Sequence, residues 1–312
     1  MIIEGFFNLD RNPFIIHPDV DFYCQLTPHE EAINMIMYAI SNQDSLIKVT
    51  GNIGLGKSIV AGCIREKLLD DEGFKVCEIR NPNLTTLELV SSICQQLARP
   101  TTDEADKQQD QSSDRLLSCL ENLLVSYREG NKKIVLIIDE AQAMEDRLLE
   151  SLRLLTNLEY ESKPLLQIIL FGQDELDIKL NQHKFRQLKQ RICFAYKVRA
   201  LTADEVSRYV QHRLYIAGSN YREIFSRSAL SVLAKYTEGI PRNINIIAHK
   251  AMLLAAGNNT YQVNRSDVLK ALSQHGISRY GLSNWKLWSI ACVLILNIAL
   301  IVIYLAKHFG NI

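Results

Sequence analysis

A glycine-rich segment near the N-terminus has the residue types and the spacing of a phosphate-binding loop. Residues 51–58 read GNIGLGKS, which is the complete G-x-x-x-x-G-K-[ST] pattern. Glycines let consecutive backbone N–H groups converge on one phosphate, and the N-terminus of a following helix adds positive potential there. Lys57 can reach the β- and γ-phosphates, and the Ser58 hydroxyl can hold Mg²⁺. The candidate nucleotide-binding residues are Gly51, Asn52, Ile53, Gly54, Leu55, Gly56, Lys57, Ser58 and Ile59.

A second motif, which ends in two acidic residues, supports this interpretation. The sequence IVLIIDEAQ begins at Ile134, and its five apolar residues predict a buried strand that ends in Asp139 and Glu140. Asp139 is expected to support the metal ion, and Glu140 is expected to polarise an attacking water. The alternative is a glycine-rich turn and an unrelated buried strand, but both motifs have the flanks and the order that a nucleotide site requires. We therefore predict binding of ATP, or a close relative, with Mg²⁺.

The surrounding pattern indicates how these residues are positioned. Short apolar runs alternate with helical segments up to about residue 200, which is typical of a parallel sheet covered by helices. After Leu201 only helices are predicted, and they form a separate lid that begins with a Thr202–Glu205 capping box. Residues 100–114 are polar and aperiodic, and we expect a surface loop there. The predicted strands are 46–50, 74–79, 134–138, 165–171 and 195–198. The predicted helices are 59–69, 84–97, 115–127, 202–215, 226–236, 242–256 and 266–273.

Composition narrows the class of protein. The 312 residues contain 35 basic and 35 acidic side chains, so the net charge is zero and the whole chain has no general attraction to nucleic acid. The seven cysteines are scattered and form no C-x-x-C pair, which argues against a zinc knuckle or a disulfide scaffold. Reduced thiols fit a reducing compartment. The N-terminus lacks the basic start and apolar core of a secretion signal.

Residues 287–306 form a run of twenty residues without any charge. A helix of this length spans the hydrocarbon core of a bilayer, which is about 30 Å thick. Twelve of the residues are Leu, Ile or Val, which suggests about −4 to −7 kcal/mol for insertion. The alternative is a buried helix of a soluble core, but core helices seldom run this long without a polar face. We predict a single membrane anchor.

The predicted organisation follows from these segments. ATP binding and reduced thiols place the N-terminal ATPase domain in the cytoplasm, with the anchor in a bacterial inner membrane. Five parts are expected: a nucleotide-binding domain over 1–200 that includes a lead-in over 1–40, a helical lid over 201–276, a juxtamembrane linker over 277–286, the anchor over 287–306, and a short tail over 307–312.

An ordered series of motifs resembles a known family. A strand-rich nucleotide core followed by a small helical bundle is similar to AAA+ ATPases. Within that superfamily the chain resembles the ExeA/GspA group of secretion ATPases, and especially its members in MSHA pilus biogenesis. The motifs are FFNLDRNPF, HPDVDFY, TPHEEA, IKVTGNIGLGKS, IIDEAQAM, LRLLTNLE, LLQIILFGQDELD, RQLKQRI and GIPRNIN. They extend over about residues 1–275. The longer proteins of the group carry a peptidoglycan-binding domain, which this sequence lacks, so cell-wall binding is not implied.

The resemblance implies further roles. Gln173 corresponds to a polar sensor near the γ-phosphate or is a helix-starting residue, and Arg242 corresponds to a lid arginine that reaches the nucleotide or is a solvated one. Arg186 and Arg191 lie where AAA+ proteins place an arginine finger that contacts the ATP of a neighbouring subunit, and we favour Arg191. Phe14 and His17 flank the adenine or belong to the core.

The leading hypothesis is therefore a membrane-anchored AAA+ ATPase. By resemblance it acts as a homo-oligomer and uses ATP hydrolysis to assemble or remodel an envelope complex, with inner-membrane proteins of a type IV pilus or a type II secretion apparatus as partners. The first alternative is a nucleotide-gated scaffold with little turnover. The second is a DNA-handling ATPase of the transposition type, but no nucleic acid partner is expected because the segment after Ser273 leads directly into the membrane run.

Overall fold

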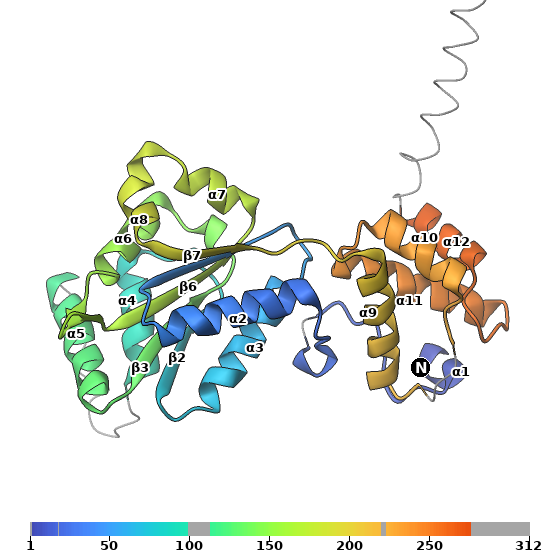
Figure 1. Cartoon of the computed structure of the whole chain (residues 1–312), viewed down its shortest axis with the longest axis horizontal. Coiled ribbons are helices and arrows are strands. Elements are labelled where there is room, and N and C mark those ends of the chain that lie inside the picture. Colours follow the sequence, from blue (N-terminus) through green and yellow to red (C-terminus); the bar gives the residue numbers. More distant parts are fainter. Residues whose placement is uncertain (1, 18, 99–112, 220–222, 276–312) are drawn as a thin grey trace, which may run out of the picture.

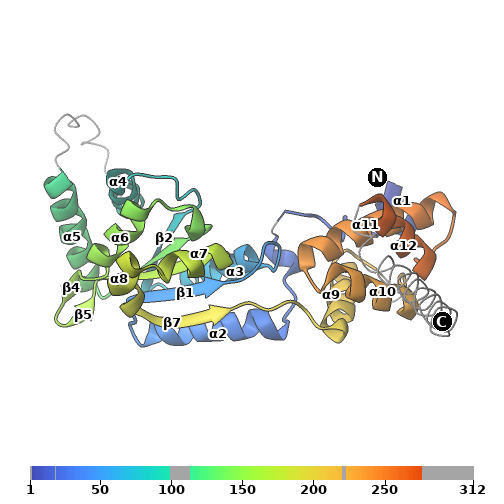
Figure 2. The same ribbon diagram turned by 90° about the horizontal axis from the view of Figure 1, so that it is seen from above.

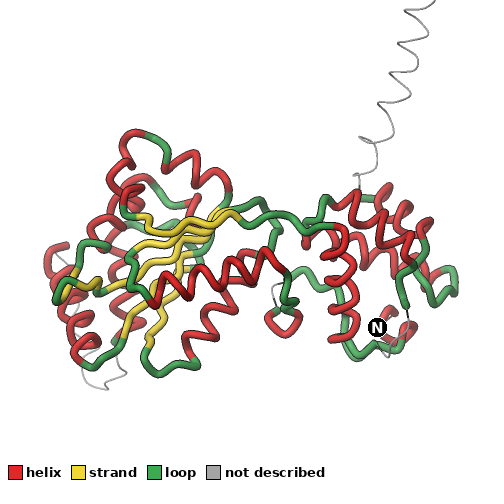
Figure 3. The backbone as a smooth tube through the Cα atoms, in the orientation of Figure 1, coloured by secondary structure: helices red, strands yellow, loops and turns green. Residues whose placement is uncertain are grey.

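The computed structural model describes residues 2–17, 19–98, 113–219 and 223–275. These residues form two parts that are connected by extended chain (Figure 1). One part contains a parallel sheet with its helices, and the other is a bundle of helices. Figure 3 shows that the sheet strands are confined to the first part.

The sheet has five parallel strands in the order β2-β3-β6-β1-β7. This order places the loop after β1 and the acidic residues after β3 on either side of the central strand β6. A separate antiparallel pair of short strands, β4 (Glu159–Tyr160) and β5 (Lys163–Pro164), follows α6. The five sheet strands are β1 (Leu46–Thr50), β2 (Phe74–Ile79), β3 (Lys133–Ile138), β6 (Leu166–Gly172) and β7 (Ile192–Lys197).

Helices cover both faces of this sheet, and strand β3 shows why. Its side chains alternate, so that Ile134, Leu136 and Ile138 pack in one apolar cluster while Val135 and Ile137 pack in the other. The second cluster contains α2 (Thr27–Ser41) and α3 (Lys57–Leu69). The first contains α4 (Thr86–Leu97), α5 (Ser113–Glu129), α6 (Asp146–Leu155), α7 (Asp174–Leu180) and α8 (Arg186–Gln190). Figure 2 shows α4, α5 and α6 on the side of the sheet away from α2.

The second part is the lid, which has an apolar core of its own. Its helices are α9 (Ala203–Ile216), α10 (Arg227–Thr237), α11 (Pro241–Gly257) and α12 (Arg265–Gln274). The lead-in packs into this core through α1 (Ile2–Phe7), where Phe6 stacks on Tyr261 with ring centroids 4.6 Å apart. The short 3₁₀ turn Val20–Phe22 also contributes Phe22 to it. The chain therefore crosses from the lid to the sheet and back.

The predicted fold, a parallel sheet covered by helices, is confirmed. The elements that were predicted differ from the structure mainly at their ends, whereas α1, α6, α7, α8 and the β4–β5 pair were not predicted. The capping box at Thr202 and Glu205 is present, and β1 and β2 have the predicted bounds. β7 begins at Ile192 instead of 195, because its alternation of half-buried and exposed residues starts there. α5 begins at Ser113, two residues earlier than predicted. The other helices differ by one or two residues at their ends.

Two predictions concern residues that the structure does not describe. Most of the polar loop predicted over 100–114 and the whole membrane run 287–306 lie outside the described residues. Among the residues that are described, no helix is both long enough and apolar enough to cross a membrane. The anchor and the domain boundaries therefore stay predictions.

Candidate nucleotide-binding site

The glycine-rich loop connects the end of β1 at Thr50 to the start of α3 at Lys57. Gly54 and Gly56 have φ angles of 81° and 95°, in the left-handed region that favours glycine. A side chain at Gly56 would also bring its Cβ to 2.9 Å from His29 Nε2. Gly56 forms the N-cap of α3, so the loop ends directly at a helix N-terminus that can receive a phosphate.

His29 supports the loop from the first turns of α2. Its Nε2 lies 2.8 Å from the backbone oxygen of Leu55, and because a carbonyl only accepts, this nitrogen carries the proton. Burial lowers the pKa of His29 below its ordinary value, which favours the neutral ring. This role was not identified from the sequence, because a single histidine 26 positions before its partner forms no recognisable spacing.

Lys57 lies inside the loop. Its Nζ donates to the backbone oxygens of Gly51 at 2.7 Å and Asn52 at 2.9 Å. Burial lowers the pKa of the Lys57 ammonium, while the nearby carboxylates of Glu140 and Asp139 act in the opposite direction. The ammonium is therefore held at the place where the glycine-rich loop can surround a phosphate.

Ser58 and Asp139 meet although they are 81 positions apart in the chain. Ser58 Oγ donates to Asp139 Oδ2 at 2.9 Å, and the other carboxylate oxygen of Asp139 accepts from the Glu140 N–H at 2.8 Å. A hydroxyl and a carboxylate are oxygen ligands of the kind that Mg²⁺ prefers, together with phosphate oxygens. The two predicted metal residues are thus brought together and fit the ion.

Glu140 lies beside this pair with its carboxylate exposed to solvent. Its backbone is left-handed, with a φ of 53°. Gln173 Nε2 donates to Glu140 Oε2 at 3.0 Å, and Gln142 Nε2 donates to the same oxygen. The amide oxygen of Gln142 also accepts from the Gln173 N–H at 2.9 Å. Two glutamine side chains therefore orient the predicted general base, and Gln142 was not identified from the sequence.

The lid closes over the loop through the N-terminus of α11. The Arg242 N–H donates to the backbone oxygen of Gly54 at 3.2 Å, and a Cβ on Gly54 would lie 2.7 Å from Arg242 Cβ. Between loop and lid lies a cavity of about 180 Å³. Residues of the loop, of the segments that follow β3 and β6, of the lead-in and of the lid form its wall. They are Ile16, His17, Ile53, Gly54, Gly56, Lys57, Ser58, Ile59, Glu140, Gln173, Tyr209, Arg213, Pro241, Arg242 and Asn245.

Other predicted residues lie away from this cavity. Arg186 and Arg191 are exposed at the two ends of α8 and do not line it. Phe14 is buried in the lid core, where its ring meets Phe225 edge to face at 5.9 Å. Of the two lead-in candidates, only His17 lines the cavity. Tyr209, Arg213 and Asn245 line it without having been predicted, because nothing in the spacing of lid residues marks them.

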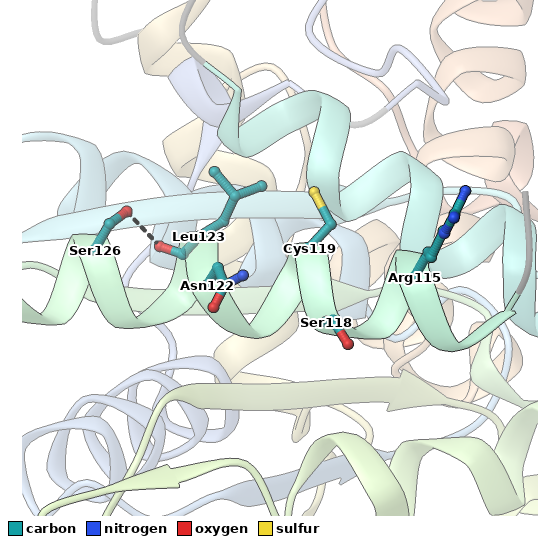
Figure 4. Close-up of a pocket in the computed structure, with 6 residues that line it drawn as sticks. All are labelled: Arg115, Ser118, Cys119, Asn122, Leu123 and Ser126. Carbon is teal, nitrogen blue, oxygen red and sulfur yellow. Dashed lines mark hydrogen bonds between the residues drawn. The ribbon is translucent and has the colours of Figure 1, made fainter. Parts of the chain in front are cut away.

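A larger hollow of about 660 Å³ runs along α5. Figure 4 shows that its lining comes from a single helix, with Arg115 near one end and Ser126 near the other. Within the hollow, Ser126 Oγ donates to the backbone oxygen of Leu123 at 2.8 Å. The lining has one charged residue, no carboxylate and no glycine-rich loop, so we assign nucleotide binding to the smaller cavity.

Comparison with known proteins places the chain among related sequences. Residues 40–180 match the family described as AAA domain. General secretion pathway protein A of Aeromonas hydrophila is 34% identical over 277 residues, which are 88% of this chain and 49% of that protein. The chain thus spans about half the length of this relative.

Solved structures show the same fold. The crystal structure of Cdc6p from Pyrobaculum aerophilum has a TM-score of 0.63 at 16% identity, and the match covers 86% of this chain and 73% of that one. The ORC1 protein of Aeropyrum pernix in complex with DNA has a TM-score of 0.60 at 16% identity, with 85% and 69% covered. At this identity the likeness concerns the fold alone.

The chain has the P-loop AAA+ fold, and its residues 40–180 match the AAA domain family. The resemblance to the ExeA/GspA group of secretion ATPases, predicted from the ordered motifs, is confirmed by the identity to General secretion pathway protein A.

Proposed function

We propose that this protein binds ATP with Mg²⁺ and hydrolyses it in the cavity between the glycine-rich loop and the lid. The observation that carries the proposal is the contact between Ser58 Oγ and Asp139 Oδ2 at 2.9 Å, with Glu140 adjacent. These side chains come from two motifs that are far apart in the chain. They converge at the first turn of α3, where the helix N-terminus and the buried Lys57 can neutralise phosphate charge.

Each residue then has a defined task. Lys57 exchanges its contacts with two loop carbonyls for phosphate oxygens, and the loop N–H groups surround the same phosphates. Ser58 and Asp139 hold the metal ion, which when bound supplies charge stabilisation for phosphoryl transfer. Glu140 accepts a hydrogen bond from the attacking water and orients it. Gln173 and Gln142 fix the carboxylate of Glu140.

Arginines from two parts of the molecule are proposed to complete the site, one from the lid and one from the sheet part. Arg242 projects from the α11 turn that contacts Gly54, so a change of lid position moves this cation relative to the phosphates. Arg191 and Arg186 are exposed and lie outside the cavity of their own chain, which is compatible with action on a neighbouring subunit. We propose Arg191 as the finger, and homo-oligomerisation as the condition for turnover.

The cellular role is proposed from the relative. The name General secretion pathway protein A supports a role related to secretion. Together with the ordered motifs, it leads us to propose envelope assembly, either in type II secretion or in MSHA-type pilus biogenesis, with inner-membrane assembly proteins as partners. The uncharged run 287–306 would anchor the chain in the inner membrane with the ATPase part in the cytoplasm. Retention of the full chain in membranes during a carbonate wash tests the anchor, and release into the supernatant would contradict it.

Turnover measured against protein concentration tests the enzymatic proposal. We expect the specific activity to rise with concentration in the presence of Mg²⁺ and to disappear on chelation. Arg191→Ala should lower turnover by about 10³-fold or more while ATP still binds. Arg186→Ala, at the other end of α8, decides between the two finger candidates, and we expect it to leave turnover largely unchanged. Tight ATP binding with no turnover at any concentration would instead favour the nucleotide-gated scaffold.

A further inference from the structure

One arginine of the lid is buried in the wall of the nucleotide cavity without a full set of partners. Arg213 lies on α9 and is only 6% exposed. Its Nε donates to the backbone oxygen of Pro13, and its Nη1 donates to Tyr209 Oη at 3.0 Å. Phe22 covers one face of the guanidinium, 4.4 Å from ring centroid to carbon. The third nitrogen, Nη2, is buried and has no hydrogen-bond partner among the described residues.

A buried guanidinium nitrogen without an acceptor is costly, because its N–H groups lose their water and gain nothing in return. Arg213 differs in this respect from Arg199, which forms a bidentate pair with Glu205. A ligand that enters the cavity and presents an acceptor to Nη2 removes the penalty.

The position of Arg213 indicates which end of a nucleotide it meets. The phosphate end is defined by Lys57 and by the contact of Arg242 with Gly54. Asn245 lies three positions further along α11, and it is connected to Arg213 through Tyr209, whose Oη donates to Asn245 Oδ1 at 3.0 Å. Arg213, Tyr209 and Asn245 thus form a polar cluster. It lies about one turn of α11 away from Arg242, which marks the phosphate end.

Apolar residues also line the cavity. Ile16 from the lead-in and Ile53 from the loop are 56% and 55% exposed. Apolar side chains together with a few placed polar groups are typical of sites that bind small ligands such as a base and its sugar. We propose that Arg213 recognises the nucleoside end of the bound nucleotide, and that Nη2 donates to an acceptor on the base or the ribose.

The same cluster attaches the lead-in to the cavity. Arg213 donates to the Pro13 oxygen, and Asn245 Nδ2 donates to the Ile15 oxygen at 3.1 Å. Ile16 and His17 follow directly and line the cavity. Arg213 thus connects the lead-in to the place where the nucleoside binds, so a ligand that orders this guanidinium also orders residues 13–17.

The inference rests on the proposed nucleotide site, and its test uses binding rather than turnover. Affinities of the full chain for Mg·ATP and for Mg·tripolyphosphate, which lacks a nucleoside, are compared by calorimetry. Arg213→Met should weaken ATP binding by about tenfold to hundredfold, the range for a hydrogen bond to a charged donor. Tripolyphosphate binding should stay within about twofold of wild type, because the phosphate contacts are unchanged. Arg208→Met on the exposed side of the same helix should change neither affinity.

The ratio of the two affinities separates recognition from a structural role. A variant that only disturbs the lid would weaken both ligands equally, and that result would overturn the proposal. Unchanged ATP affinity in Arg213→Met would overturn it as well. Arg213→Lys keeps the charge but loses the planar fork. It is measured in parallel with the same expected loss of ATP affinity, and it replaces the methionine variant if that variant does not fold. Failure of the wild type to bind ATP would instead refute the proposed function.

Discussion

The ion pair between Arg199 and Glu205 connects the chain leaving β7 to the first turn of α9, and Glu205→Gln tests its contribution. The two guanidinium nitrogens Nη1 and Nη2 donate to the two carboxylate oxygens at 2.8 and 3.0 Å. Glu205 also accepts from the Thr202 N–H at 2.8 Å as part of the capping box. Glutamine can keep this cap through its amide oxygen, so the substitution mainly removes the charge.

The pKa of Glu205 gives the magnitude. Hydrogen bonding to Arg199 is the largest influence and lowers the pKa from 4.5 to about 2, against the opposing effect of burial. At 1.36 kcal/mol per pKa unit this corresponds to at most about 3 kcal/mol at neutral pH. Arg199 is 44% exposed while Glu205 is 4% exposed, so water screens the pair and we expect about 1–3 kcal/mol. Because the folded-state pKa is lowered, this stability is present above pH 4.5 and is lost as the pH falls through 2.

Urea unfolding of the wild type, Glu205→Gln, Arg199→Gln and the double variant measures the coupling directly. We expect a coupling energy of about 1–3 kcal/mol at pH 7, and one that declines in acid. Asp204→Asn, which removes an exposed charge from the same helical turn, is the control and should have little effect. A coupling near zero at pH 7, or one that grows as the pH falls, would refute this account of the connection to the lid.

Two further predictions concern the glycine-rich loop. His29→Phe leaves the Leu55 oxygen without its donor, so we expect a loss of about 1–3 kcal/mol and a weaker affinity for Mg·ATP in calorimetry. Since burial lowers the pKa of His29, the wild type should lose stability as the pH falls below about 6.5, and an identical decline in His29→Phe would contradict the assignment. Gly56→Ala forces a Cβ to a φ of 95° and to 2.9 Å from His29 Nε2, which should cost about 1–3 kcal/mol and weaken nucleotide binding. Gly257→Ala, where an added Cβ meets nothing within 4 Å, is the control, and equal behaviour of the two variants would argue against strain in the loop.

Local pattern was sufficient to predict the core of the site. The loop sequence, Lys57, Ser58 and the strand leading to Asp139 carry their own flanks, so their convergence follows from parallel strands that end at one edge of a sheet. The ends of elements were predicted less accurately where the apolar pattern is weak. β7 is an edge strand with alternating exposure, and its short apolar run does not define where pairing begins.

Contacts between distant segments could not be predicted in the same way. His29 acts through one carbonyl of the loop, and Gln142 acts through the orientation of Glu140 and Gln173. Arg213 meets Pro13 across 200 positions of the chain. Each of these roles depends on contacts that form only in the folded chain. A single arginine, glutamine or histidine in a sequence does not indicate which distant residue it will contact.

The most direct test of the account is the separation of binding from turnover in Glu140→Gln. The glutamine has the size of the native residue and can still accept from Gln173 and Gln142, but it cannot act as a base. Calorimetry with Mg·ATP and steady-state phosphate release should show near-native affinity with turnover reduced by about 10²-fold or more, while Glu145→Gln, an exposed acid five positions away, stays active. Turnover equal to wild type in Glu140→Gln, with ATP still bound, would contradict the assigned chemistry.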